Sequence, residues 1–271
     1  MALDYRGTTA LITGASSGLG SDFARQLAAR GADVVLVARR LDRLEALAAE
    51  LRRAHGIVAT PIAADLAAPG AIDALVGTLA ERGITISTLV NNAGFATRSR
   101  FEHDDPARVH EQVTLNVTAL VDLTRALFPQ LLANGRGALI SVASTGAYQP
   151  VPNMAVYGAT KAFVLSFTEA LWYEAKGSGL RVLALSPGAT RTEFFDVAGE
   201  NARVGSFREP ADVVELALAT VDRRNPPPSI IDGAANRAAA FLVRVLSRRA
   251  AVSLSGSVTG RYPIDAVSTP A

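Results

Sequence analysis

The fold of this chain is decided by the stretch Thr13-Gly14-Ala15-Ser16-Ser17-Gly18-Leu19-Gly20, which follows an apolar, strand-like run and precedes an amphipathic helical pattern. A glycine-rich turn between a strand and a helix lets backbone N–H groups approach a pyrophosphate, and the helix N-terminus adds favourable partial charge. Such a turn can also require glycine for backbone reasons alone. Its place after the first strand favours a dinucleotide-binding turn.

Outward from this turn, short strand-like runs alternate with longer helical patterns over the first 190 residues. The strand-like runs are 8–13, 33–38, 58–63, 88–91, 138–142 and 181–186, and the helical patterns are 19–30, 41–54, 71–82, 108–132 and 155–175. This alternation predicts an α/β fold of the Rossmann type, a doubly wound parallel sheet whose ligand crevice lies at the carboxyl ends of the strands.

The remainder of the chain departs from this alternation. Residues 189–207 have no clear period, 209–223 are helical, and Ser229-Ile230-Ile231 is a candidate edge strand, which gives about seven strands. An amphipathic, Arg-bearing helix is expected over 236–249, and the last twenty residues are expected to fray. We expect 1–271 to form a single domain, with its core at 7–192, a substrate loop and helical region at 189–223, and a C-terminal extension at 233–271.

Composition excludes several classes of function. The chain has 271 residues, no Cys, a net charge of +2 and three scattered His, so thiolate chemistry is excluded and no metal site is expected. The sequence contains no block of basic residues, so nucleic-acid binding is not expected. Neither a secretion signal nor an apolar run of spanning length is present in the sequence, so a cytoplasmic location is expected. The C-terminal helix could cover a subunit, close the site or rest on a membrane surface, and packing on the protein itself is favoured over the membrane.

The end of the second predicted strand bears on the choice of cofactor. Sites that prefer NAD usually place a carboxylate there to bond the ribose 2′-hydroxyl, whereas this chain has Arg39 and Arg40. Arg39 would instead meet a 2′-phosphate, to which a planar guanidinium forms strong charge-assisted bonds. The alternative is that both Arg simply open a solvated helix, with Asp42 and Glu45 as partners. We favour NADP(H).

Serine, tyrosine and lysine side chains follow the fifth predicted strand. Ser144 stands just past it, and Tyr157 lies thirteen residues later, four residues before Lys161 at the start of a helix. Residues four apart share one helix face, so the ammonium should lie one turn from the phenol. A close ammonium favours the phenolate and lowers a phenol pKa of roughly 10 toward neutrality. A lone Tyr-x-x-x-Lys is more often a surface pair, so the inference depends on the combination with the glycine turn.

In combination these motifs resemble the short-chain dehydrogenase/reductase family over about residues 7–192. The resemblance implies a catalytic tetrad of Asn116, Ser144, Tyr157 and Lys161, in which Asn116 holds a water of the proton relay. Ser141 and Thr145 compete with Ser144 for its role. The cofactor-binding residues that it implies are Gly14, Ser16, Ser17, Gly18, Leu19, Gly20, Asp65, Leu66, Asn92, Ala93, Gly94, Tyr157, Lys161, Pro187, Gly188, Thr190 and Thr192.

The expected activity is hydride transfer between NADP(H) and a ketone or secondary alcohol. Ser144 and Tyr157 would hold the carbonyl oxygen while Tyr157 gives its proton. Three alternatives stay open: a 3-oxoacyl reductase, a non-catalytic NADP(H)-binding regulator, and an epimerase or dehydratase of nucleotide sugars. The small-molecule carbonyl or alcohol is the expected partner, and a homodimer or homotetramer is the expected assembly.

Overall fold

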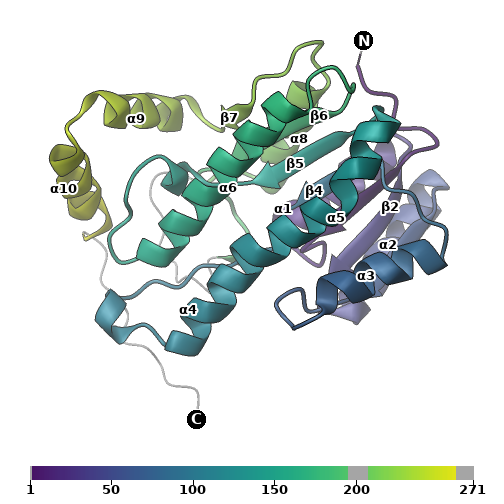
Figure 1. Ribbon diagram of the computed structural model, residues 1–271, viewed down its shortest axis with the longest axis horizontal. Helices are drawn as coiled ribbons and strands as arrows, with labels where there is room; N and C mark the ends of the chain where they lie inside the picture. The colour runs from purple at the N-terminus through teal and green to yellow at the C-terminus, as the bar shows by residue number, and fades with distance from the viewer. Residues whose placement is uncertain (1, 195–206, 261–271) are drawn as a thin grey trace.

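The computed structural model describes residues 2–194 and 207–260 and contains one parallel sheet of seven strands (Figure 1). Their order across the sheet is β3-β2-β1-β4-β5-β6-β7, and every pairing is parallel. The strands are β1 (Thr9–Thr13), β2 (Asp33–Ala38), β3 (Ala59–Ala63), β4 (Thr88–Asn91), β5 (Ala138–Val142), β6 (Arg181–Ser186) and β7 (Ser229–Ile231). The chain order reverses between β1 and β4, which confirms the predicted doubly wound sheet and its seventh, edge strand.

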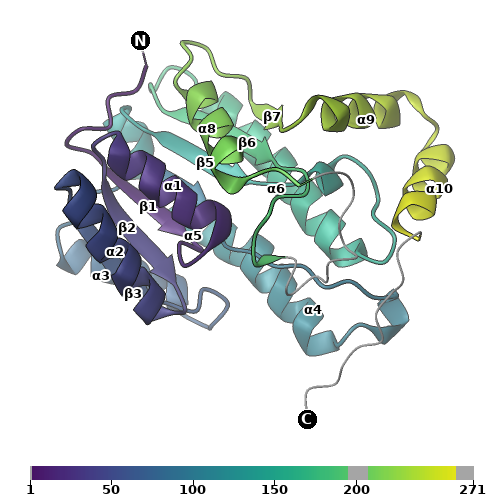
Figure 2. The same cartoon turned by 180° about the vertical axis from the view of Figure 1, so that it is seen from behind.

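Helices cover both faces of the sheet. Figure 2 shows α1 (Gly18–Ala29), α2 (Leu41–His55) and α8 (Pro210–Val221) on one face, and Figure 1 shows α5 (Ala119–Asn134) and α6 (Ala155–Glu174) on the other, with α3 (Ala71–Glu81). Each face has its own apolar core, since Phe23 and Leu44 pack on one side and Leu123 and Leu127 on the other. Strands buried on both faces are largely apolar, as in β2 and β5.

The helix predicted over 108–132 is not continuous. It begins as α4 (Pro106–Val113), widens into a π-helical segment at Thr114–Thr118, and resumes as α5. Asp105 precedes it as the N-cap, and its carboxylate accepts a hydrogen bond from the backbone N–H of Ala107. A π segment inside a helix often marks a functional site. Here it contains Asn116.

The C-terminal extension also differs from the prediction. The prediction of one continuous helix over 236–249 is wrong. Helix α9 (Ala234–Val245) ends at Leu246, whose backbone is extended. Ser247 then caps a new helix, α10 (Arg248–Thr259). The expected fraying is wrong for 252–259, since α10 continues and buries Ala251 and Thr259; residues 261–271 lie outside the described residues. Both views show α9 and α10 leaving the sheet beyond β7.

Candidate active site

A cleft of about 630 Å³ opens at the carboxyl ends of strands β1 to β6. It gathers most of the site residues predicted from the sequence, although they come from seven separate segments. Those that line it are Gly14, Ser16, Ser17, Gly18, Leu19, Arg39, Arg40, Asp65, Leu66, Asn92, Ala93, Gly94, Ser144, Tyr157, Lys161, Pro187, Gly188, Thr190 and Thr192. Gly20 and Asn116 lie behind the lining residues.

The glycine turn after β1 has the shape of a phosphate cradle. Gly18 has a φ of +52°, and a Cβ there would lie 2.8 Å from Cγ2 of Thr192 across the cleft. A Cβ on Gly20 would meet the Gly14 carbonyl oxygen at 2.2 Å, so Gly20 lets α1 pack under the turn. Within the described residues the Ser17 side chain makes no capping bond, and the first turn of α1 carries no acid. The backbone N–H groups of this turn can therefore serve an anion, and these residues fit a dinucleotide pyrophosphate.

The segment after β4 is held in place by Thr13 at the end of β1. The Thr13 hydroxyl accepts hydrogen bonds from the backbone N–H groups of Asn92, at 2.9 Å, and Ala93, at 3.0 Å. The Asn92 amide donates to the Thr13 carbonyl oxygen at 2.9 Å. These bonds fix the floor of the cleft below the glycine turn. After β3, Asp65 lines the cleft and also accepts from the backbone N–H of Ala67, so it caps a turn as well.

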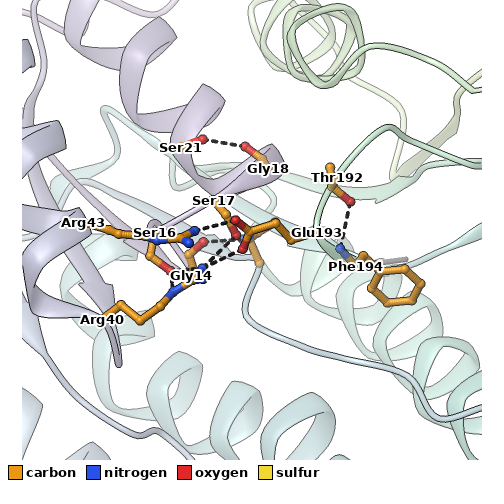
Figure 3. A network of polar contacts seen from close by, with 11 residues as sticks. Gly14, Ser16, Ser17, Gly18, Ser21, Arg40, Arg43, Thr192, Glu193 and Phe194 are labelled. Atoms are coloured by element: carbon orange, nitrogen blue, oxygen red, sulfur yellow. Dashed lines mark hydrogen bonds and ion pairs between the residues drawn. The ribbon is translucent and has the colours of Figure 1, made fainter. Parts of the chain in front are cut away.

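At the end of β2 the two predicted arginines have different surroundings. Arg39 is 69% exposed and lies 3.7 Å from a Glu111 oxygen. Arg40 donates to the hydroxyls of Ser16 and Ser17 at 3.0 and 3.2 Å, and to Glu193 at 2.9 Å. Figure 3 shows Arg43 reaching the same Glu193 carboxylate. Sequence reasoning missed Arg43, although it stands one helical turn after Arg40, and missed Glu193, for which no local pattern exists.

Ser144, Tyr157 and Lys161 meet at the other end of the cleft. Ser144 Oγ accepts a hydrogen bond from the Gly146 N–H at 3.1 Å, which leaves the serine hydrogen free to point to the Tyr157 hydroxyl. Lys161 is 6% exposed; its Nζ donates to the Val142 carbonyl oxygen at 2.8 Å and lies 5.9 Å from the Tyr157 ring centroid. Two hydroxyls and one ammonium therefore face the same small volume.

The pKa values of this group differ from the sequence-based expectation. Burial raises the pKa of Tyr157 to about 12, and the hydrogen bond from Ser144 opposes that rise. Burial lowers the pKa of Lys161 to about 8. Desolvation is the largest cause acting on the phenol, and the bond to Ser144 is the cause that lowers its pKa, so the lowering expected from Lys161 is not found. The Lys161 ammonium donates to the Val142 carbonyl oxygen instead.

Asn116 connects the segment after β4 to helix α6. Its amide donates to the Phe95 carbonyl oxygen at 2.9 Å and to the Thr160 hydroxyl at 3.2 Å, and its carbonyl oxygen accepts from the Phe95 N–H at 3.1 Å. A Cβ on Gly94 would approach the Asn116 oxygen to 2.8 Å. The side chain is thus occupied in fixing the loop next to Lys161, and it lies within the π-helical segment.

Replacement of Asn116 by Ala should lower the free energy of unfolding by about 2–4 kcal/mol, because its three hydrogen bonds to Phe95 and Thr160 are lost and only Gln112 still donates to the Phe95 carbonyl oxygen. Urea unfolding checks this value. The control is Asn134→Ala, which removes a single 2.8 Å bond to Ser87 and should cost about 1 kcal/mol. Equal costs for the two variants would contradict the connecting role of Asn116.

The outer wall of the cleft comes from the C-terminal extension, whose role the sequence left open. α9 and α10 contribute mostly small and apolar side chains, joined by Met154 and Phe194, whose ring lies 5.6 Å from that of Tyr157. The wall residues from the two helices are Asn236, Ala239, Ala240, Leu242, Val243, Ala251, Leu254, Ser255, Val258 and Thr259. A Cβ on Gly188 would lie 2.4 Å from the Asn236 amide, so α9 packs directly on the segment after β6.

Known proteins resemble this chain in sequence and in structure. A sulfoacetaldehyde reductase of Chromohalobacter salexigens is 42% identical over 185 residues, which are 68% of this chain and 72% of the relative. A short-chain dehydrogenase from Sphingobium yanoikuyae, solved in complex with NADPH, is 36% identical with a TM-score of 0.77, covering 97% of this chain and 98% of that one. A 7β-hydroxysteroid dehydrogenase structure is 26% identical with a TM-score of 0.84, covering 94% and 100%.

The same result comes from the family model. The model of the short chain dehydrogenase family matches residues 8–203, which include the glycine turn, Ser144, Tyr157 and Lys161. With its seven-stranded parallel sheet and its cleft at the strand ends, the chain belongs to the short-chain dehydrogenase/reductase family of oxidoreductases.

Proposed function

We propose that this protein transfers a hydride between NADP(H) and a ketone or secondary alcohol. The observation that carries the proposal is the meeting of the Ser144 and Tyr157 hydroxyls with the buried Lys161 ammonium in the same cleft as the glycine turn. A proton donor beside a nucleotide cradle is the arrangement that carbonyl reduction requires. In this proposal the catalytic residues are Ser144, Tyr157 and Lys161, with Asn116 as a positioning residue.

The preference for NADP(H) rests on charge at the end of β2. Arg39, Arg40 and Arg43 gather there, and Ser16 and Ser17 add hydroxyls. A phosphate on the adenosine ribose would find guanidinium donors at this end of the cleft. The NADPH complex of the Sphingobium relative supports the same cofactor.

Side chains of the protein would supply the proton that the substrate oxygen receives. Bound NADPH would supply the hydride. Ser144 and Tyr157 would donate hydrogen bonds to the substrate oxygen, where negative charge develops, and Tyr157 would release its proton to that oxygen. A phenol with a pKa of about 12 is fully protonated near neutrality and so suits reduction. In the reverse direction Tyr157 must be deprotonated, and the Lys161 ammonium would stabilise the phenolate through space, since its Nζ lies 5.9 Å from the Tyr157 ring centroid although it donates to Val142.

The part of the cleft next to Tyr157, where the substrate would bind, favours an uncharged, bulky carbonyl compound. Its wall is formed by Met154, Phe194 and the apolar residues of α9 and α10. Among the described residues that line the cleft, the cationic side chains are Arg39, Arg40 and Lys161, and only Lys161 lies at the reacting end. Among the described residues, a small anionic aldehyde such as sulfoacetaldehyde would find little complementary charge beyond Lys161, whereas burial of apolar groups would bind a ring or branched ketone.

A substrate panel tests this function. Oxidation of NADPH should be measured with bulky ketones, sulfoacetaldehyde and 3-oxoacyl thioesters, each also with NADH. Turnover of the bulky ketones with NADPH is the expected result. Preference for the thioesters would point to a 3-oxoacyl reductase, and tight NADPH binding with no turnover across the panel would indicate a regulatory binder.

Arg40→Ala should lower kcat/KM with NADPH by roughly 10- to 100-fold, because it removes charge-assisted bonds to the 2′-phosphate worth about 1.5–3 kcal/mol. The rate with NADH should change by less than about twofold, since NADH lacks that phosphate. Arg136→Ala, outside the cleft, is the control. An equal loss with both cofactors would contradict the assignment.

A further inference from the structure

The Glu193 carboxylate lies between two arginines at the cofactor end of the cleft (Figure 3). Its Oε2 is 2.9 Å from Arg40 Nη2, and its Oε1 pairs with Arg43 Nη1. The hydrogen bond from Arg43, together with Arg40, holds the pKa of this carboxyl below its ordinary value, although burial opposes it. Glu193 is therefore an anion bound by the chain's own guanidinium groups.

This position coincides with the donors that the proposed cofactor needs. Arg40 Nη2 bonds Ser16, Ser17 and Glu193 at once, and Ser16, Ser17, Arg40 and Glu193 all line the cleft. A ribose 2′-phosphate carries about −1.5 to −2 charges near neutrality and seeks the same planar donors. The two anions cannot share Arg40 and Arg43 without strong repulsion.

We propose that Glu193 is a specificity-determining residue that competes with the 2′-phosphate of NADP(H) for Arg40 and Arg43. This inference rests on the proposed function. Glu193 lies in the segment after β6, 153 residues from Arg40 in the sequence. The fold therefore places the competing Glu193 carboxylate next to Arg40. A ligand with a 2′-phosphate must displace the carboxylate, and a ligand without one leaves the ion pairs in place.

The expected change in ligand affinity depends on how exposed the three charged side chains are to solvent. The Arg40, Arg43 and Glu193 side chains are 41–45% exposed, so water weakens both ion pairs. Removal of the competing charge in Glu193→Gln should therefore tighten binding of a 2′-phosphate ligand by about threefold to tenfold. Binding of the same ligand without that phosphate should change by less than about twofold.

Calorimetric titration of the full chain with adenosine 2′,5′-bisphosphate and with adenosine 5′-monophosphate tests the competition without turnover. We expect Glu193→Gln to tighten only the bisphosphate. The matched control is Glu209→Gln, which breaks an exposed pair with Arg191 at 3.0 Å outside the cleft lining and should leave both ligands unchanged. In a variant with Arg40→Ala and Arg43→Ala, the effect of Glu193→Gln should disappear.

Three outcomes would overturn the competition: unchanged bisphosphate affinity in Glu193→Gln, weaker bisphosphate affinity, or an equal gain for both ligands. Failure of the proposed cofactor preference gives a different signature. Equal affinity of the wild-type chain for the two ligands would overturn the NADP(H) preference, and a selective gain in Glu193→Gln would still support the competition.

Discussion

Replacing Tyr157 with Phe should reduce turnover by roughly 10²- to 10⁴-fold, because the proposed proton donor is lost while the ring and its packing remain. The rings of Phe194 and Tyr157 lie with their centroids 5.6 Å apart, and a phenyl ring at position 157 keeps that contact. NADPH binding, followed by fluorescence titration, should be retained within a few-fold. The loss should therefore be in kcat.

Tyr148→Phe is the matched control for this variant. The Tyr148 hydroxyl lies 3.3 Å from Ser186 Oγ, and the residue is not among those that line the cleft. Its removal should leave turnover near the wild-type value. Wild-type rates in Tyr157→Phe would overturn the proposed mechanism.

Lys161→Met should abolish a pH-dependent part of the stability as well as most of the turnover. Burial lowers the pKa of Lys161 from 10.5 to about 8, so between these values the unfolded chain binds more protons than the folded chain. Stability of the wild type therefore rises with pH through this window, and the cost of the buried charge is present in full below it. The free energy of unfolding of the wild type relative to Lys161→Met should increase by roughly 3 kcal/mol across the window.

Urea unfolding at several pH values, without added cofactor, measures this difference. Lys176→Met is the control, since Lys176 is the only other lysine of the chain and its Nζ lies exposed over the rings of Trp172 and Tyr173. That variant should follow the wild type at every pH. A pH-independent difference between the wild type and Lys161→Met would contradict the buried-charge explanation. Reduction should also slow as pH rises past about 8, where Lys161 loses its charge.

Much of the fold was predictable because its determinants are local. Apolar runs of strand length, separated by helical patterns, predict a parallel sheet covered on both faces, and the structure has that sheet. The elements that sequence reasoning placed wrongly depend on contacts distant in the chain. The helix at 108–132 is widened at Asn116, whose side chain binds Phe95 and Thr160, and the C-terminal helix is broken at Leu246 before α10 packs over the cleft.

The sequence by itself determined the glycine turn after β1 and the four-residue spacing of Tyr157 and Lys161, since a turn and a helix face are set by neighbouring residues. Tertiary structure alone decided what surrounds them. It encloses Tyr157 so that burial raises its pKa, commits the Lys161 ammonium to Val142, and brings Glu193 to Arg40 and Arg43. Burial and charge pairing depend on which distant segments meet, and no local spacing encodes that meeting.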